Sequence, residues 1–224
     1  GCFAKTFGLN AESEPAIYAA VTNPNAYLEN VSVNEDGTVN FFDDNFTANG
    51  RATFPFGLIE DAAPAQDLPA VSFVLILNRN DNLIPAVTKL TAEQAAAFFM
   101  LGETQGTSAG GKEEAGKALR VPGTNPFFPL LHAQQGNRFL ELISGLDFDV
   151  YLMNTGWVGG AEGTPHSKKV KIRHSSAIVQ GIAKQSISWK PDPTFGYELA
   201  LGVDGFSDDD RGLLAPQEYY EATS

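Results

Sequence analysis

Short apolar or alternating stretches along the chain predict β-strands separated by amphipathic helices. Four ranges have strand character: residues 1–9, 51–59, 70–77 and 149–153. A β-hairpin is predicted where the alternating segments 27–33 and 38–42 flank a glycine-containing turn. The chain therefore contains both hairpin-paired strands and strands connected through helices.

Helical periodicity and capping residues predict four helices, over 12–21, 91–101, 137–143 and 174–184. The second has the clearest ends, because Thr91 stands at the N-cap, Gln94 at the capping-box position, and Gly102 just after the last turn. The remainder to Ser224 is predicted to be strand and loop. These elements predict one α/β domain with a mixed sheet and flanking helices.

Composition narrows the class of protein. The 224 residues carry a formal charge of −12, which argues against general affinity for nucleic acid or acidic membranes. The longest apolar run, Pro69 to Leu77, is too short to span a membrane. Cys2 is the single cysteine, which excludes an internal disulfide and suits a reducing compartment. We expect a cytoplasmic protein.

Basic residues nevertheless gather at two places in this acidic chain. One group is compact and the other looser: Lys168, Lys169, Lys171 and Arg173; Lys112, Lys117 and Arg120. The compact group is either a solvated basic edge or a pocket for a phosphate or carboxylate. The contrast with the acidic background favours the pocket.

The segment 102–126 is rich in glycine, serine, threonine and charge, and is predicted to be a mobile lid or a disordered loop. Within it, residues 106–112 fit the pattern G-x-x-x-x-G-K of a phosphate loop. That loop requires a preceding strand and a Ser or Thr after the lysine, whereas here a helix precedes it and Glu113 follows. A glycine-rich lid is the better interpretation.

No metal site is predicted on this chain. The three histidines, His132, His166 and His174, lack the close spacing of a zinc-binding helix. The run Asp208 to Asp210 could hold a divalent cation, but in an acidic protein such a run is usually solvated.

Several ordered motifs resemble the ATP-dependent phosphoenolpyruvate carboxykinase family. They keep the family's order as far as about Val179 and match its G-C-Y-A-K-T…E-P, L-E-N-V…D-G-T-V, T-E-N-T-R, L-P-P-V-S-R-L-T-x-E-Q, N-T-G-W and G-K-R-I-x-I-K-x-T-R-A-I-I segments. The matching stretches here are Gly1–Thr6 with Glu14–Pro15, Leu28–Val31 with Asp36–Val39, Thr47–Arg51, Ile84–Gln94, Asn154–Trp157 and Lys168–Val179.

The resemblance implies a fold and an activity. The chain would be the C-terminal, nucleotide-binding lobe of a carboxykinase-like fold, as a single domain over residues 1–224. The whole enzyme is a carboxy-lyase of gluconeogenesis that converts oxaloacetate and ATP to phosphoenolpyruvate, CO₂ and ADP, with a divalent metal such as Mg²⁺ or Mn²⁺. The chain begins with Gly1 inside a predicted strand. We therefore expect the family's phosphate loop and metal ligands to lie upstream, and the isolated segment to be inactive.

The family's functional positions can be carried over by motif. Lys5 and Glu14 would face the nucleotide, and Arg51, as the catalytic cation, would contact its γ-phosphate. The base and ribose would lie against Lys169, Val170 and Ser175. An arginine that is always charged suits developing phosphoryl charge, and a lysine adds a point charge.

Departures from the family pattern leave two alternatives open. The T-A-D-A-F-G segment is replaced by residues 77–82, the lid T-A-K-x-A-G-T-E-R-G by 104–113, and the C-F-G motif by Asn125–Phe128. The lid's cation would then be Lys112. The alternatives are a related ATP-dependent kinase acting on another small carboxylate, and a non-catalytic nucleotide-binding or regulatory domain.

Overall fold

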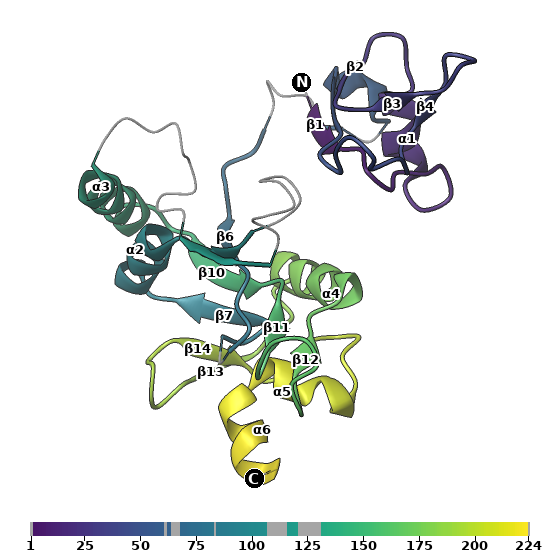
Figure 1. Ribbon diagram of the computed structural model, residues 1–224. Coiled ribbons are helices and arrows are strands. Elements are labelled where there is room, and N and C mark those ends of the chain that lie inside the picture. The colour runs from purple at the N-terminus through teal and green to yellow at the C-terminus, as the bar shows by residue number, and fades with distance from the viewer. Residues whose placement is uncertain are drawn as a thin grey trace. The chain divides into compact units, whose positions relative to one another are not determined.

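The computed structural model describes residues 2–60, 62–63, 68–82, 84–106, 116–120 and 131–223. The chain divides into two compact units (Figure 1). The first comprises Gly1–Ala70 with Gly106–Lys117, and the second comprises Val71–Gln105 with Ala118–Ser224. That both belong to a single ATP-binding domain stays a prediction.

The first unit is built on a three-stranded antiparallel sheet. Its strand order is β1 (Cys2–Lys5), β5 (Arg51–Phe54) and β2 (Tyr27–Glu29). The short helix α1 (Pro15–Val21) and the hairpin of β3 (Ser32–Val33) with β4 (Val39–Asn40) complete it, and a single 3-10 turn, Phe56–Leu58, follows β5. A small core of Leu9, Ala20, Val21, Phe41, Ala52 and Phe54 holds the unit together.

The second unit contains a mixed five-stranded sheet. Its order is β13 (Trp189–Pro191), β14 (Glu198–Ala200), β7 (Val87–Leu90), β10 (Asp149–Asn154) and β6 (Phe73–Asn78). Strand β10 pairs with β6 in parallel and with β7 antiparallel. The predicted α/β class with a mixed sheet and flanking helices is therefore confirmed.

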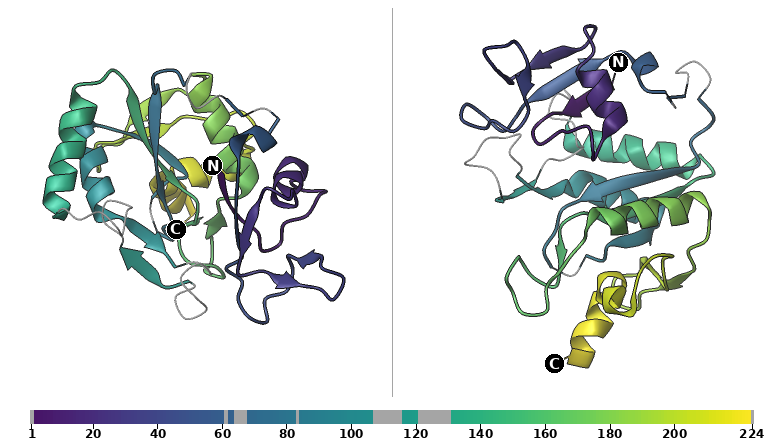
Figure 2. Two further views of the ribbon diagram at one scale, coloured as in Figure 1. Left: turned by 90° about the horizontal axis from the view of Figure 1, so that it is seen from above. Right: turned by 90° about the vertical axis from the view of Figure 1, so that its right-hand side faces the viewer.

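Helices cover both faces of this sheet, as the two views of Figure 2 show. Val150 and Leu152 of β10 are buried on the face that carries α2 (Ala92–Leu101) and α3 (His132–Ser144). Tyr151 and Met153, which alternate with them, are buried on the opposite face with α4 (Ile172–Ala183). The period-2 alternation of an apolar strand thus produces two cores, one on each side.

Helix α2 begins and ends where its capping residues predict. Thr91 Oγ1 accepts a hydrogen bond from Gln94 N at 3.3 Å, and Gln94 Oε1 accepts one from Thr91 N at 3.0 Å. Gly102 follows the helix with φ of 54°, a left-handed conformation that favours glycine. The capping box and the glycine stop are both confirmed.

Several predicted element boundaries differ from the structure, among them the starts of two helices. Helix α1 begins at Pro15 rather than at residue 12, because proline suits the first helical position. Helix α3 begins at His132, five residues before the predicted start. Its first turns contain the buried pair Gln135 and Gly136, which have no apolar periodicity, so only the later turns were recognisable in the sequence.

The predicted strand and loop after residue 184 is correct for β13 and β14 but wrong for the end of the chain. A 3-10 turn, Asp208–Asp210, leads into α5 (Arg211–Leu214), and α6 (Pro216–Thr223) follows. Ser207 and Asp210 form a capping box that starts the turn, and Pro216 begins α6. These short helices carry too few apolar positions to show a helical period.

Two small hairpins lie beside the main sheet of the second unit. One joins β8 (Glu103–Gln105) to β9 (Ala118–Arg120), and the other joins β11 (Trp157–Val158) to β12 (Lys168–Lys169). Most of the predicted lid segment 102–126, with Lys112, lies outside the described residues. No helix in the described ranges is long and apolar enough to cross a membrane.

Candidate functional site

Lys5 and Arg51 are brought together in the first unit. They are Cα partners in the antiparallel register of β1 and β5. Arg51 Nη1 lies 3.6 Å from Glu29 Oε1, and Arg51 Nε donates to Asn49 Oδ1 at 3.3 Å. The Arg51 guanidinium also lies 6.0 Å from the ring centroid of Phe3. Two cations therefore project from one face of a short sheet, as the predicted nucleotide contacts require.

Glu14 occupies a different place in the same unit. It is the residue immediately before α1, and its exposed side chain makes no capping hydrogen bond to that helix. A carboxylate in this position is available to a polar ligand, but nothing among its described contacts identifies one. Its predicted contact with the nucleotide stays a prediction.

Lys169, Val170 and Ser175 lie in the second unit, in and after the β11–β12 hairpin. Lys169 is the Cα partner of Trp157, and its Nζ lies 5.5 Å from the Trp157 ring centroid. Val170 N donates to Gly156 O at 3.0 Å, and the Val170 side chain is buried in the core on the α4 side. Ser175 is half-buried in the first turn of α4. The three positions thus lie in one short segment that runs from the end of β12 into the first turn of α4.

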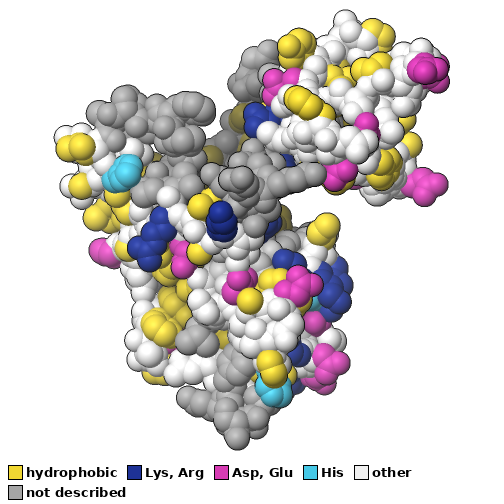
Figure 3. All heavy atoms as spheres, in the orientation of Figure 1, with side chains coloured by type: hydrophobic (Ala, Val, Ile, Leu, Met, Phe, Trp, Pro, Cys, Tyr) yellow, Lys and Arg dark blue, Asp and Glu magenta, His cyan; other side chains and the backbone are white. Residues whose placement is uncertain are grey.

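The compact basic group surrounds a single hollow in the second unit. The hollow has a volume of about 290 Å³ and is lined by Lys168, Lys169, Lys171, Arg173, His174, Ser207, Asp209, Asp210 and Leu213. Figure 3 shows Lys and Arg side chains gathered over the α4 part of the surface, with acidic side chains beside them. All four basic residues therefore line one pocket together with Asp209 and Asp210, and the binding of an anion there stays a prediction.

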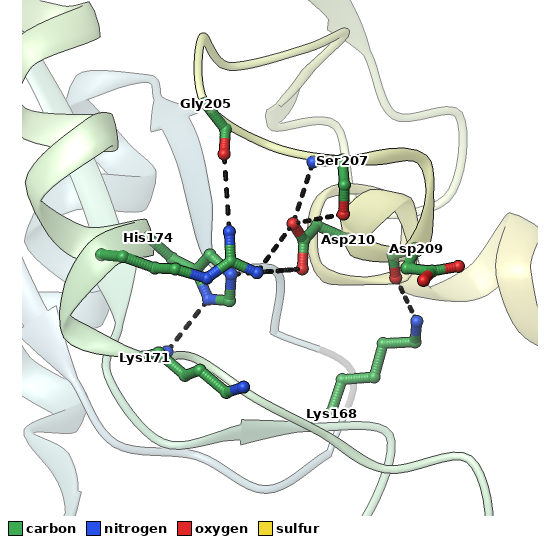
Figure 4. A network of polar contacts seen from close by, with 8 residues as sticks. Lys168, Lys171, His174, Gly205, Ser207, Asp209 and Asp210 are labelled. Atoms are coloured by element: carbon green, nitrogen blue, oxygen red, sulfur yellow. Dashed lines mark hydrogen bonds and ion pairs between the residues drawn. The ribbon is translucent and has the colours of Figure 1, made fainter.

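A buried carboxylate, that of Asp210, is among the groups that line this hollow, and Figure 4 shows its polar contacts. Asp210 is 7% exposed and accepts hydrogen bonds from Ser207 N at 2.9 Å and from Ser207 Oγ at 2.8 Å. Arg173 Nη2 donates to both Asp210 oxygens at 3.0 Å. Lys168 Nζ donates to the backbone oxygen of Asp209. The basic turn is thereby attached to the acidic segment before α5.

The pKa values of Asp210 and His174 are both lowered. Burial by itself would raise the pKa of Asp210, but hydrogen bonds from Ser207 and Arg173 outweigh it and hold the pKa well below the ordinary value. Burial lowers the pKa of His174, and the positive charge of Arg173 lowers it further against the attraction of Asp210. Asp210 is therefore a carboxylate, and His174 a neutral imidazole, at neutral pH.

The hydrogen bonds around His174 define its tautomer. Its Nδ1 accepts a hydrogen bond from Lys171 N at 3.0 Å, so the proton of the neutral ring is on Nε2. Nε2 lies 3.2 Å from Asp210 Oδ1, and the ring contacts Phe206 with centroids 4.9 Å apart. The side chain is 2% exposed. His174 thus ties the backbone at the start of α4 to the buried carboxylate.

We expect the second unit to lose stability as the pH falls below about 6.5, the ordinary histidine pKa, because His174 is harder to protonate when folded than when unfolded. The stability that neutral His174 contributes is complete above the pKa of the unfolded histidine and is lost as the pH falls toward its lowered pKa in the folded state. The free energy of unfolding then changes by at most about 1.4 kcal/mol per pH unit. Urea unfolding from pH 8 to pH 5, followed by Trp157 and Trp189 fluorescence, measures it.

A matched pair of variants separates His174 from the carboxylates that titrate in the same range. His174→Phe should flatten the pH dependence, since the titrating group is gone. His132→Gln, which removes an exposed histidine from α3, should leave the slope unchanged. Equal slopes in wild type and His174→Phe would show that His174 does not titrate on unfolding.

The acidic run was only partly understood from the sequence. Asp208 has a side chain 90% exposed and pairs with Arg211 at 2.8 Å, which agrees with the solvated interpretation. For Asp210 that interpretation is wrong, because Asp210 is buried and bonded to Ser207 and Arg173. The available signal was the spacing of Ser207 and Asp210, which matches an N-cap and its third helical position.

Comparison with known proteins finds one matching family and several similar proteins. The profile of the family described as phosphoenolpyruvate carboxykinase matches residues 1–209. A phosphoenolpyruvate carboxykinase (ATP) of Allorhizobium ampelinum is 33% identical over 223 residues, which are 97% of this chain and 41% of the relative. Its counterpart from Chelativorans sp. is 34% identical over 230 residues, covering 99% and 42%. The corresponding protein of Rhizobium etli is 34% identical over 223 residues, covering 97% and 41%. The chain spans about two fifths of the length of these relatives.

Proposed function

Because this chain belongs to the phosphoenolpyruvate carboxykinase family, we propose that it forms the nucleotide-binding part of an ATP-dependent enzyme that converts oxaloacetate and ATP to phosphoenolpyruvate, CO₂ and ADP. The observation that carries the proposal is the pairing of Lys5 with Arg51 on neighbouring strands, inside a family match that covers 209 of 224 residues. The product would serve gluconeogenesis in the cytoplasm.

In this proposal Arg51 and Lys5 act on the phosphates of ATP. Phosphoryl transfer spreads negative charge over the transferred group, and catalysis depends mostly on positioned cations. Arg51 presents a planar fork of N–H donors, held in place by Asn49 and Glu29. Lys5 adds a compact positive charge from the adjacent strand. Both residues would therefore bind the transition state more tightly than the ground state.

Lys169, Val170 and Ser175 would bind the base and ribose, as the family resemblance implies. Lys169 has its Nζ over the ring of Trp157, which offers a flat apolar surface beside a cation. Val170 is fixed by its backbone bond to Gly156, and Ser175 supplies a hydroxyl in the first turn of α4. This combination of an apolar wall, a hydroxyl and a cation suits a nucleoside.

A divalent metal is implied by the family, and the described residues limit which side chains could hold it. Among the residues that the structure describes, no three His, Cys, Asp or Glu side chains come together as a possible metal site. We therefore assign the metal no ligand on this chain and derive no step through it.

The proposal is tested by assaying the complete protein that contains these residues. Purified protein is given ATP, Mg²⁺ or Mn²⁺ and oxaloacetate, and phosphoenolpyruvate and CO₂ are measured. We expect ATP-dependent formation of both. Formation of ADP only with another small carboxylate in an acceptor panel would favour the related kinase. Binding of ATP without turnover of any acceptor would favour the non-catalytic nucleotide-binding domain.

A further inference from the structure

Asp210 connects two segments that lie far apart in the sequence. Its carboxylate accepts two hydrogen bonds from Ser207 and two from Arg173, and lies 3.2 Å from His174 Nε2. Ser207 belongs to the segment before α5, whereas Arg173 and His174 are in the first turn of α4 (Figure 4). One buried carboxylate therefore holds the start of α4 against the segment before α5.

The contacts continue from α4 to the residues that would face the nucleotide. Asp210 lies beside His174, and His174 Nδ1 accepts from the Lys171 backbone N–H. Lys171 is the N-cap of α4 and directly follows the turn of Lys169 and Val170. Ser175 N in turn donates to Lys171 O at 3.2 Å. Asp210 thus contacts, through Arg173 and His174, the segment Lys169–Ser175 that carries the predicted base and ribose contacts.

The exposure of Arg173, which binds Asp210, favours a positioning role for Asp210 over a role in packing alone. Arg173 has a side chain 51% exposed, so its bond to Asp210 is not needed to fill a core. In contrast, the Asp210 carboxylate is buried, and the four hydrogen bonds that it accepts from Ser207 and Arg173 hold it in a fixed geometry beside the buried ring of His174. Asp210 also lies one residue beyond the family match of 1–209.

We propose that Asp210 is a positioning residue for nucleotide binding, which holds the turn Lys169–Ser175 in its binding conformation through Arg173 and His174. This inference rests on the proposed function, because it needs that turn to contact ATP. It predicts an effect on the affinity for ATP rather than on the chemical step, since Asp210 acts only through the backbone of the nucleotide-facing turn.

The variant Asp210→Asn in the complete enzyme tests the proposal. The amide keeps the shape of the side chain but loses its charge and turns one acceptor into a donor facing Arg173 or Ser207. We expect the KM for ATP to rise about tenfold, with kcat and the KM for oxaloacetate within about twofold of wild type. The matched control is Asp208→Asn, which removes the same charge at a position two residues earlier. The Asp208 side chain is 90% exposed, so this variant should change neither kcat nor the KM for ATP or oxaloacetate.

Hydrogen exchange provides a readout that does not depend on catalysis. In Asp210→Asn the amides of residues 171–176 should exchange at least tenfold faster, while those of β10 should exchange as in wild type. If Asp210→Asn does not fold, Ser207→Ala removes the hydroxyl donor to the same carboxylate. It should then raise the KM for ATP two- to threefold and speed exchange at the same amides.

The outcomes distinguish this inference from the proposed function. Wild-type ATP turnover with an unchanged KM for ATP in Asp210→Asn would overturn the positioning role alone. A fall in kcat without a change in that KM would also overturn it. A wild-type enzyme that neither turns over nor binds ATP would overturn the proposed function and with it the link to the nucleotide. In that case exchange at residues 171–176 would still show whether Asp210 orders the turn.

Discussion

Arg51→Ala in the complete enzyme should lower the kcat of ATP-dependent phosphoenolpyruvate formation by about 10³-fold or more. Arginines that contact a transferred phosphoryl group contribute on the order of 10³ to 10⁵ in rate. Lysine should not replace Arg51 fully, because an ammonium cannot form the planar fork that the guanidinium offers to two oxygens. Steady-state kinetics of wild type, Arg51→Ala and Arg51→Lys measure both effects.

The same substitution should hardly change the stability of the first unit. The Arg51 side chain is 36% exposed and that of Glu29 is 47% exposed, and their ion pair is 3.6 Å long. Exposed pairs of this kind contribute about 0 to 1 kcal/mol. A large loss of activity with an almost unchanged melting temperature would therefore place Arg51 in the chemistry and not in the fold.

Glu29→Gln is the matched control. It removes the partner of Arg51 but keeps the cation, so kcat should stay within a few-fold of wild type. If Arg51→Ala keeps the activity of wild type, Arg51 is an ordinary strand residue and the proposed catalytic role is wrong. If both variants are inactive, the orientation given by Glu29 is as important as the cation.

The fold could be predicted where local chemistry and tertiary structure agree. Helix α2 has a threonine cap, a glutamine at the third position and a glycine stop, and each makes the contact that the sequence predicts. Strand β10 was recognisable because its central residues Val150–Met153 form a run of large hydrophobic and aromatic side chains that is buried on both faces. The helices after Asp208 were not recognisable, because α5 has four residues and α6 begins only after an intervening alanine.

The site could be predicted in part. The motif carry-over placed Lys5 and Arg51 at positions that the antiparallel register makes neighbours. The clustering of Lys168, Lys169 and Lys171 with Arg173 predicted the basic pocket that the structure contains. The role of Asp210 was missed, since its capping-box spacing to Ser207 is a local signal but its bond to Arg173, 37 residues away, gives none. Long-range contacts of this kind follow from packing and not from a sequence window.

Asn154 makes the most extensive side-chain hydrogen-bond network in the described part of the second unit. Its Nδ2 donates to the backbone oxygens of Asn80 at 3.2 Å, Ile84 at 3.0 Å and Trp157 at 3.0 Å. Its Oδ1 accepts from Asn80 N at 3.1 Å and Gly156 N at 2.8 Å. The side chain is 0% exposed and ties the loop after β6 to the turn after β10.

Asn154→Ala should therefore destabilise the second unit by about 3 to 5 kcal/mol, near the upper end for single substitutions. The alanine leaves the N–H groups of Asn80 and Gly156 and the carbonyls of Ile84 and Trp157 without this partner. Each buried group left unpaired costs about 1 to 3 kcal/mol, offset by local relaxation. Urea unfolding followed by circular dichroism and by tryptophan fluorescence measures the change, since Trp157 and Trp189 are both in this unit.

Asn154→Asp sharpens the test, because it keeps the shape and one acceptor but removes the donor to three carbonyl oxygens. A buried carboxylate facing carbonyls is unfavourable, so this variant should be at least as unstable as alanine. The control is Asn137→Ala, an exposed asparagine on α3, which should change stability by no more than about 0.5 kcal/mol. If Asn154→Ala behaves like Asn137→Ala, the connection between β6 and β10 does not depend on this side chain, and the N-T-G-W motif owes its asparagine to something other than folding.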